Sequence, residues 1–210
     1  MFVKAVELEN DLDFSTMCYF YIDENTRTGL LIDPGAEPDK LLRIIHDNNW
    51  KIEKILLTHG HFDHIGAVEK LHKELKIPYY IHHIGLKYLK NPALNLSSFL
   101  ARPITLNEAI PLNDNEKITL DKVPDFEMET VFTPGHTEDS VIFYDKSNHL
   151  AFVGDTIFKN SIGATHFPGG DYALLQNSIK EKIFTMPENT VLYSGHSEPT
   201  DVKTEKQRYL

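Results

Sequence analysis

One arrangement recurs four times along this chain and limits what it can fold into. A short apolar run is followed by a tight turn that opens with residues able to bind a metal, and the four runs are residues 55–58, 130–133, 151–153 and 191–194. Short apolar runs bounded by turns are typical of buried strands. Open α/β sheets bind ligands at the carboxyl ends of their strands. If the four strands lie side by side, seven side chains meet at one edge: His59, His61, Asp63, His64, His136, Asp155 and His196.

The turn after residues 55–58 is the most specific of the four, because three imidazoles and one carboxylate occur within six residues, 59–64. His59 and His61 are two positions apart, so on an extended chain both rings point to the same side. Neutral imidazole nitrogens and carboxylate oxygens suit zinc, iron and manganese. A polar turn that is His-rich by chance is the alternative, but three exposed histidines so close together have no evident stabilising purpose.

The other three turns carry one ligand type each, His136, Asp155 and His196. Alone, each would be weak evidence, because a single loop histidine is more often a surface residue than a ligand. Each of them, however, follows a glycine at the end of an apolar run. Glycine allows a sharp turn that aims the next side chain inward. The shared placement therefore predicts that these three residues join the first cluster.

The chain has 11 His but only 1 Cys. The other six histidines are interpreted as surface, turn or supporting residues: His46, His72, His82, His83, His149 and His166. Cys18 lies in an apolar run and is predicted to be a core thiol, since a single cysteine cannot form an internal disulfide. The absence of a disulfide scaffold favours a reducing compartment, and we expect a cytoplasmic protein.

The formal net charge is −10, from 21 Lys and Arg against 31 Asp and Glu. Such an acidic chain is not expected to bind nucleic acid or an anionic membrane in general. The N-terminus shows no secretory signal, and no window approaches the roughly 18 apolar residues of a membrane span. We therefore expect a small-molecule substrate, and the sequence leaves the oligomeric state open.

Strands and helices are interspersed in both halves, which predicts a layered α/β protein. With 210 residues and no shift in composition, we expect one domain over residues 1–210. Asn91 to Asn115 is poor in apolar pattern and rich in Pro and Asn, and is interpreted as an irregular loop or insertion. The predicted helices cover residues 41–45, 65–75 and 175–183, and the predicted strands residues 17–23, 28–33, 52–57, 79–82, 117–120, 129–133, 141–144, 150–153 and 190–193.

These residues resemble the metallo-β-lactamase superfamily, whose signature is His-x-His-x-Asp-His, then a distant His, a Gly-Asp and a final Gly-His. Asp33-Pro34-Gly35 is similar to the early strand-end motif of that family. The segments 154–158, 167–171 and 195–200 are similar to its glyoxalase-II (hydroxyacylglutathione hydrolase) branch. The resemblance implies an α/β fold in the form of a four-layer αββα sandwich. Because no C-terminal helical domain follows before Leu210, the short single-domain group is the best match.

The resemblance also implies a mechanism. One metal ion would be held by His59, His61 and His136, and a second by Asp63, His64 and His196, with Asp155 bridging the two. Two Zn²⁺ ions are expected, with iron or manganese as alternatives. A metal-bound hydroxide would attack a thioester carbonyl, with Asp63 and Asp155 as catalytic residues. Asp33 would orient a ligand histidine. Two divalent ions against two carboxylates and a hydroxide leave a local charge near +1, which suits an anionic thioester.

Three departures from the family pattern bear on the substrate. The usual Gly-His-Thr-Pro-Gly-Ser is here residues 135–140 with Glu138 and Asp139 in place of Pro-Gly. An Arg common in the glyoxalase-II branch is replaced near Ala164, and an Asp usual two residues later is His166. The missing helical domain and these changes leave recognition of glutathione open.

Other functions on the same scaffold stay open. An iron-dependent persulfide dioxygenase would need one metal, held by His59, His136 and Asp155. Hydrolysis of a lactam, lactone, other ester or phosphodiester is also compatible with the ligand set. A binding module without catalysis is disfavoured, because the chain keeps all seven ligand residues.

Overall fold

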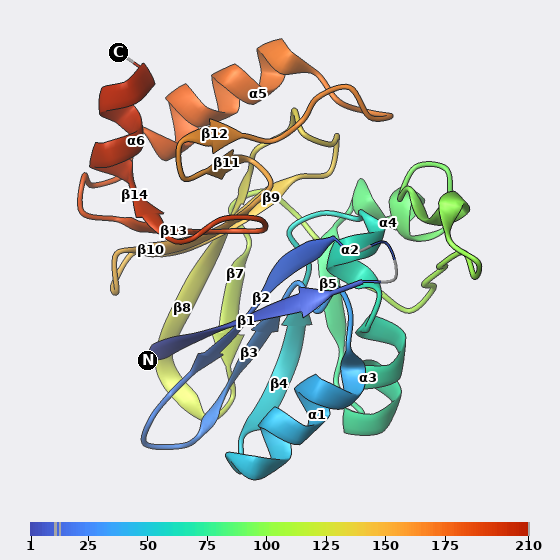
Figure 1. Cartoon of the computed structure of the whole chain (residues 1–210). Helices are drawn as coiled ribbons and strands as arrows, with labels where there is room; N and C mark the ends of the chain where they lie inside the picture. Colours follow the sequence, from blue (N-terminus) through green and yellow to red (C-terminus); the bar gives the residue numbers. More distant parts are fainter. Residues whose placement is uncertain (11, 13, 210) are drawn as a thin grey trace.

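Two six-stranded sheets face each other, and helices cover both outer surfaces (Figure 1). The structure is a computed structural model that describes residues 1–10, 12 and 14–209. The layers follow the order helix, sheet, sheet, helix. This confirms the four-layer αββα arrangement that the family resemblance implied.

The first sheet has the strand order β1-β2-β3-β4-β5-β6. Its first three strands are antiparallel, and the rest continue in parallel from β3. The helices of this half follow its strands and lie on its outer side (Figure 1). The elements are β1 (Phe2–Glu9), β2 (Ser15–Ile22), β3 (Thr28–Ile32), α1 (Pro38–Asp47), β4 (Lys51–Leu56), α2 (Phe62–Ile65), α3 (Val68–Leu75), β5 (Tyr79–His82), α4 (Gly85–Leu89), the 3₁₀ turn η1 (Ser97–Phe99) and β6 (Ile110–Leu112).

The second sheet has the order β14-β13-β10-β9-β8-β7. Within the described part of this sheet, only β10 and β13 pair in parallel. Since β9 runs against both β8 and β10, the strands β8, β10 and β13 all end at the same edge. The elements are β7 (Lys117–Leu120), β8 (Val123–Phe132), β9 (Val141–Asp145), β10 (Leu150–Gly154), β11 (Ile157–Phe158), β12 (Ser161–Ile162), α5 (Tyr172–Ser178), the π-helical turn η2 (Ile179–Ile183), β13 (Val191–Ser194), β14 (Thr200–Asp201) and α6 (Val202–Tyr209).

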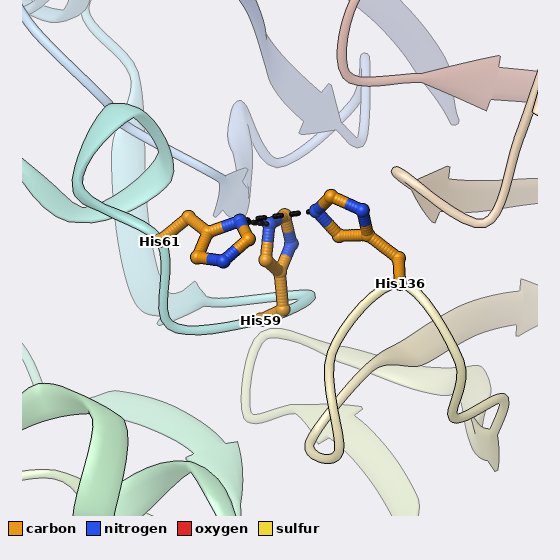
Figure 2. Close-up of side chains that lie close together, drawn as sticks. All are labelled: His59, His61 and His136. Carbon is orange, nitrogen blue, oxygen red and sulfur yellow. Dashed lines mark hydrogen bonds between the residues drawn. The ribbon is translucent and has the colours of Figure 1, made fainter. Parts of the chain in front are cut away.

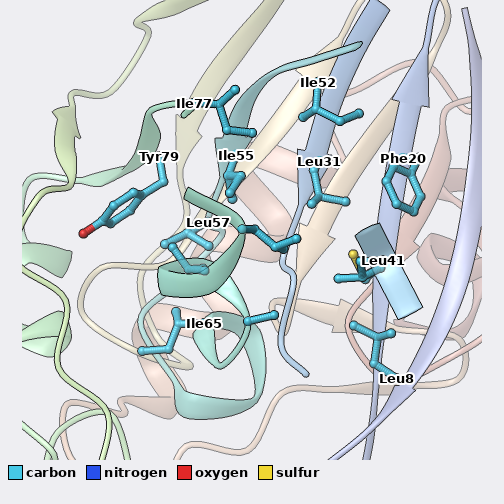
Figure 3. Packing of buried hydrophobic residues seen from close by; sticks show 14 of the residues in the cluster. Leu8, Phe20, Leu31, Leu41, Ile52, Ile55, Leu57, Ile65, Ile77 and Tyr79 are labelled. Atoms are coloured by element: carbon cyan, nitrogen blue, oxygen red, sulfur yellow. The ribbon is translucent and has the colours of Figure 1, made fainter. Parts of the chain in front are cut away.

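The central strands are buried on both faces, and successive side chains point to different apolar layers. In β3, Leu31 packs toward α1 and α3, whereas Leu30 and Ile32 pack between the sheets. In β10, Phe152 points between the sheets and Val153 toward α5. Figure 3 shows the outer layer of the first sheet, where α1 and α3 pack on β2, β3 and β4. Burial on both faces explains why these strands read as continuous apolar runs.

The element predictions are largely confirmed. Asp171 caps α5 as expected, since its side chain accepts a hydrogen bond from the backbone N–H of Leu174. Five described strands have no counterpart in the prediction: β1, β6, β11, β12 and β14. The last four have only two or three residues each, and β1 is an edge strand whose Lys4, Glu7 and Glu9 interrupt the apolar pattern. The irregular stretch expected over residues 91–115 is shorter in the structure, because β6 joins the first sheet beside β5. Among the described residues, no helix is long and apolar enough to span a bilayer.

Candidate metal centre

The first group of ligand residues follows the carboxyl end of β4. After β4 ends at Leu56 the chain bends at Thr58 and His59 and reaches His61, which directly precedes α2 and is extended, with φ −68° and ψ 150°. The single turn of α2 then carries Asp63 and His64, and both side chains are buried. The short bend between β4 and the helical turn, together with that turn, therefore presents four donor side chains to one point.

The remaining ligand residues follow β8, β10 and β13, which belong to the second sheet. The expectation that all four strands lie side by side in one sheet is therefore wrong, because β4 lies in the first sheet. The site instead lies where the edges of the two facing sheets meet. Two backbone hydrogen bonds join these edges: the N–H of Val141 donates to the carbonyl of Thr58 at 2.9 Å, and the N–H of Met17 on β2 donates to the carbonyl of Gly195 at 2.7 Å.

Gly154 makes this close approach feasible. Its φ of +48° lies in the left-handed region, and a Cβ here would lie 2.4 Å from Oγ1 of Thr58. The sharp turn after β10 aims Asp155 into the space between the sheet edges, as the glycine pattern predicted.

Three imidazoles form the first cluster, shown in Figure 2. Nε2 of His59 and Nε2 of His136 lie 3.1 and 3.0 Å from Nδ1 of His61. Nitrogens bound to one tetrahedral zinc ion at 2.0–2.1 Å would be about 3.3 Å apart, so this spacing is close to that of a ligand set. The sequence prediction that these three residues come together is thus met by their positions.

The second cluster is formed by Asp63, His64 and His196, with Asp155 between it and the first. Nε2 of His196 lies 3.2 Å from a carboxylate oxygen of Asp63 and 3.2 Å from one of Asp155. Nε2 of His64 lies 3.4 Å from Asp155, and Nε2 of His136 lies 3.5 Å from it. Asp155 thereby contacts residues of both clusters, which is the position expected of a bridging carboxylate.

The outward ring nitrogens are held by acceptors, and this fixes the tautomers. Nδ1 of His64 lies 2.9 Å from the carboxylate of Asp33, and Nδ1 of His136 lies 2.7 Å from the carbonyl of Ala164. Nδ1 of His196 lies 2.8 Å from the carbonyl of Ser15. Since carboxylates and carbonyls only accept, these Nδ1 atoms carry the proton and, in a neutral ring, leave Nε2 with a lone pair facing the clusters. The sequence predicted that Asp33 orients a histidine. It could not predict the carbonyls of Ala164 and Ser15 as partners, because every residue has a backbone carbonyl.

Asp63 has a further partner that the sequence did not reveal. Oγ1 of Thr16 donates to Oδ2 of Asp63 at 2.8 Å, and both residues are buried. Thr16 lies on β2, 47 positions away in the chain. Such a partner is visible only once β2 and α2 are packed together.

The two clusters differ electrostatically. Burial lowers the pKa of His59, His61 and His136, that of His61 to about 3, so their rings are neutral and available as ligands. Burial alone would also lower the pKa of His196, but the carboxylates of Asp155 and Asp63 raise it to about 10. The second cluster therefore attracts positive charge between its carboxylates.

The residues present fit divalent metal ions. In the first cluster the Nε2 lone pairs of His59 and His136 both face Nδ1 of His61. A proton on this Nδ1 could be donated to only one of the two Nε2 atoms, whereas a bound cation is coordinated by all three nitrogens. Among the described residues, buried atoms without a hydrogen-bond partner include Nε2 of His64 and Oδ1 of Asp155, both facing the second cluster. Unpartnered buried polar atoms are costly unless something binds them. Imidazole and carboxylate donors suit zinc, iron or manganese.

The departures from the family pattern lie around this centre. Asp139 is fully buried, and burial raises the pKa of its carboxyl to about 7. Ala164, near the position of the missing Arg, contributes its carbonyl to His136. His166 is exposed.

The other histidines lie outside the clusters. His46 is exposed and His149 lies in an exposed turn with φ 50°, in keeping with the prediction. His72 is only partly exposed, because Nδ1 bonds the carbonyl of Ile77. His82 is buried and stacks on Phe132, with ring centroids 4.5 Å apart.

Comparison with known proteins gives a consistent family. A family model described as the metallo-beta-lactamase superfamily matches residues 12–196. The chain is 38% identical over 191 residues to the probable metallo-hydrolase YqgX of Bacillus subtilis, covering 90% of this chain and 89% of the relative. It is 29% identical over 195 residues to the hydroxyacylglutathione hydrolase GloC of Haemophilus influenzae, covering 92% and 91%.

Solved structures agree. The BLEG-1 B3 metallo-beta-lactamase has a TM-score of 0.89 and 36% identity, covering 98% of this chain and 97% of that one. TTHA1623, crystallised in a di-iron-bound form, has a TM-score of 0.84 and 30% identity, with 97% of both chains covered. The similarity to these structures therefore extends over nearly the whole chain, and the range matched by the family model, residues 12–196, contains both clusters.

Proposed function

Because the chain belongs to the metallo-beta-lactamase superfamily, we propose that it is a metal-dependent hydrolase of thioesters. Its relatives include proteins named as metallo-hydrolases, and one is named as a hydroxyacylglutathione hydrolase. The preference for a thioester over another acyl compound follows from the side chains around the substrate space.

The observation that carries this choice is the set of ionisable groups around the substrate space. A cavity of about 370 Å³ opens on both clusters, and every ionisable residue that lines it in the described chain is a proposed metal ligand: His61, Asp63, His136, Asp155 and His196. No separate side chain is therefore placed to protonate a leaving group. A thiolate leaves with little protonation, whereas an alkoxide or an amine needs a general acid. The site thus favours thioesters.

In this proposal His59, His61 and His136 hold one ion, Asp63, His64 and His196 hold the second, and Asp155 contacts both. When bound, divalent ions polarise a carbonyl and lower the pKa of water, which allows hydrolysis at neutral pH. We propose two Zn²⁺ ions per chain, with iron or manganese as alternatives, and the di-iron form of TTHA1623 supports iron as the first of these.

The chain's own residues orient this machinery. Asp33 fixes the ring of His64, and Thr16 fixes the carboxylate of Asp63. If only the first site is filled, Asp63 is free to act as a proton acceptor 3.2 Å from Nε2 of His196. The lone, buried Cys18 supports a cytoplasmic location.

Purified protein should contain one to two equivalents of Zn, Fe or Mn by elemental analysis. It should hydrolyse S-lactoylglutathione or another thioester, lose that activity with a chelator and regain it when metal is added. The double variant His61→Ala/Asp155→Ala should lose both metal and activity, while His46→Ala, in the exposed surface, keeps both. Full activity in the double variant would refute the proposal.

The iron-dependent dioxygenase alternative has one supporting observation. Oδ2 of Asp155 lies 3.5 Å from Nε2 of His136, so a single ion in the first cluster could also take Asp155 as a ligand. Oxygen consumption with a persulfide substrate, together with one iron per chain and no thioester hydrolysis, would favour that reaction. Hydrolysis of β-lactams, lactones or phosphodiesters is tested with the same protein and the corresponding substrates.

A further inference from the structure

The cavity above the two clusters is apolar apart from the proposed ligands themselves. Its volume of about 370 Å³ exceeds the roughly 150 Å³ that accommodates a benzene-sized group. The apolar residues of its lining are Leu12, Phe14, Phe62, Leu96, Phe99 and Phe167. Three of them are large and exposed, Phe99 at 79%, Leu12 at 51% and Phe14 at 46%. Large apolar side chains exposed around a concave site mark a surface that binds something apolar.

Two aromatic rings of this lining lie directly against the metal centre. The ring of Phe14 packs on His196, with centroids 4.8 Å apart, and the ring of Phe167 packs on His61, with centroids 5.9 Å apart. The apolar walls therefore begin at both clusters. A group held between these walls lies next to the bond that the centre would cleave.

The wall contributed by the segment after α4 is anchored. Asn95 is fully buried, and its Nδ2 donates to the carbonyls of Tyr88 and Ile104, both at 3.0 Å. Its own carbonyl accepts from the N–H of Phe62 on α2 at 2.8 Å, which places this segment beside α2 as in Figure 1. Leu96 and Phe99, which follow Asn95, are thus held over the centre by specific hydrogen bonds.

Cations are missing from this lining. None of its eleven described residues is Lys or Arg. A glutathione thioester carries two carboxylates on its peptide part, and within the described cavity these would find no Lys or Arg side chain. The walls therefore do not match the anionic part of such a substrate, whereas they match an alkyl or aryl group.

We propose that this cavity binds a bulky apolar group beside the scissile carbonyl, so that the preferred substrates are thioesters carrying an alkyl or arylalkyl group; this rests on the proposed thioester hydrolysis. The apolar group belongs either to the acyl part or to the thiol part of the substrate. Two substrate series separate these, one with a fixed small thiol and a growing acyl chain, the other with a fixed acetyl group and a growing thiol.

In one of the two series kcat/KM should rise about fourfold for each added methylene until the cavity is filled. A phenylalkyl member of that series should exceed S-lactoylglutathione. Phe99→Ala should reduce the selectivity for the largest over the smallest member about threefold to tenfold, because part of the wall is removed. Phe99 suits this test since its ring is the most exposed of the lining phenylalanines. Tyr172→Ala, which removes an aromatic ring that is 62% exposed and outside the cavity, should leave the selectivity unchanged.

A binding measurement tests the cavity without hydrolysis. By calorimetry, 4-phenylbutanoate should bind the metal-loaded protein about thirtyfold more tightly than acetate, and Phe99→Ala should reduce that ratio. Preference in binding without turnover of any thioester would support the cavity and refute the thioester proposal. Thioester turnover that is flat along both series, with equal binding of the two carboxylates, would support hydrolysis and overturn the inference about the cavity.

Discussion

Asp33 and His64 are joined by a buried hydrogen bond in which Nδ1 of His64 donates to Oδ2 of Asp33 at 2.9 Å. The same carboxylate also accepts from the N–H and the hydroxyl of Thr58, at 2.8 and 2.6 Å. Asp33 has φ 50°, a conformation that Asp and Asn tolerate better than other non-glycine residues. A residue 31 positions away in sequence thus sets the tautomer of a proposed metal ligand.

Asp33→Asn should weaken metal binding at the second cluster about 10-fold to 100-fold. Asparagine keeps the backbone conformation but offers one acceptor oxygen to three donors, so its amide must face either Thr58 or His64. Competition with a chromophoric chelator measures the affinity. Asp39→Asn, in an exposed side chain, serves as control, and unchanged affinity in Asp33→Asn with a native circular dichroism spectrum would contradict the orienting role.

Gly195→Ala should remove the ion of the second cluster although every ligand is retained. A Cβ at position 195 would lie 2.2 Å from Oδ1 of Asp155 and 2.7 Å from Cε1 of His64, so these side chains must move. Elemental analysis should show the loss of about one metal equivalent. Gly170→Ala is the matched control, because its Cβ would meet the carbonyl of Thr165 at 2.4 Å instead of a ligand. Two full equivalents in Gly195→Ala would show that the centre does not depend on this close approach.

Asp139→Asn should change how stability depends on pH. Burial raises the pKa of Asp139 from 3.8 to about 7 in the folded protein. Between these values the folded state holds a proton that the unfolded state has released, so this group lowers the free energy of unfolding as pH rises, by up to about 1.4 kcal/mol per pH unit. Below pH 3.8 and above pH 7 its contribution is constant.

The free energy of unfolding by urea, measured in chelator from pH 4 to 8, tests this. Relative to the wild type, Asp139→Asn should gain stability as pH rises through that window, while Asp47→Asn, in an exposed side chain, should follow the wild type. Because protonation of the histidines acts on both proteins alike, the difference isolates Asp139. Parallel curves for wild type and Asp139→Asn would mean that the carboxyl is already ionised below pH 7.

Removal of metal should lower the thermal stability of the protein. Ions that bind only the folded state stabilise it by about 2.7 kcal/mol at a free concentration of 100 times Kd. Without bound ions, Nε2 of His59 and Nε2 of His136 both face Nδ1 of His61, and Oδ1 of Asp155 is buried without a hydrogen-bond partner, which is unfavourable. Differential scanning calorimetry with and without chelator measures the change in Tm, and the double variant His61→Ala/Asp155→Ala should show no response. An equal Tm for loaded and chelated wild type would rule out folding-linked binding.

Much of the site follows from the sequence because its residues lie in local patterns. The close spacing of His59, His61 and Asp63 after an apolar run predicted that several metal ligands lie just after β4. The glycines before His136 and Asp155 indicated the turns that aim these two side chains inward. Apolar runs that read as strands, interspersed with helical patterns in both halves, predicted the layered α/β class.

Only the tertiary structure decided how those pieces meet. Nothing local in the sequence shows that β4 lies in one sheet and β10 in the other, since strand pairing depends on packing between residues far apart in the chain. The same holds for Thr16 beside Asp63, for the carbonyl of Ser15 beside His196, and for Phe99 above the centre. The sequence alone therefore determined which atoms can bind metal, and the packing of two sheets decided where they converge and what surrounds them.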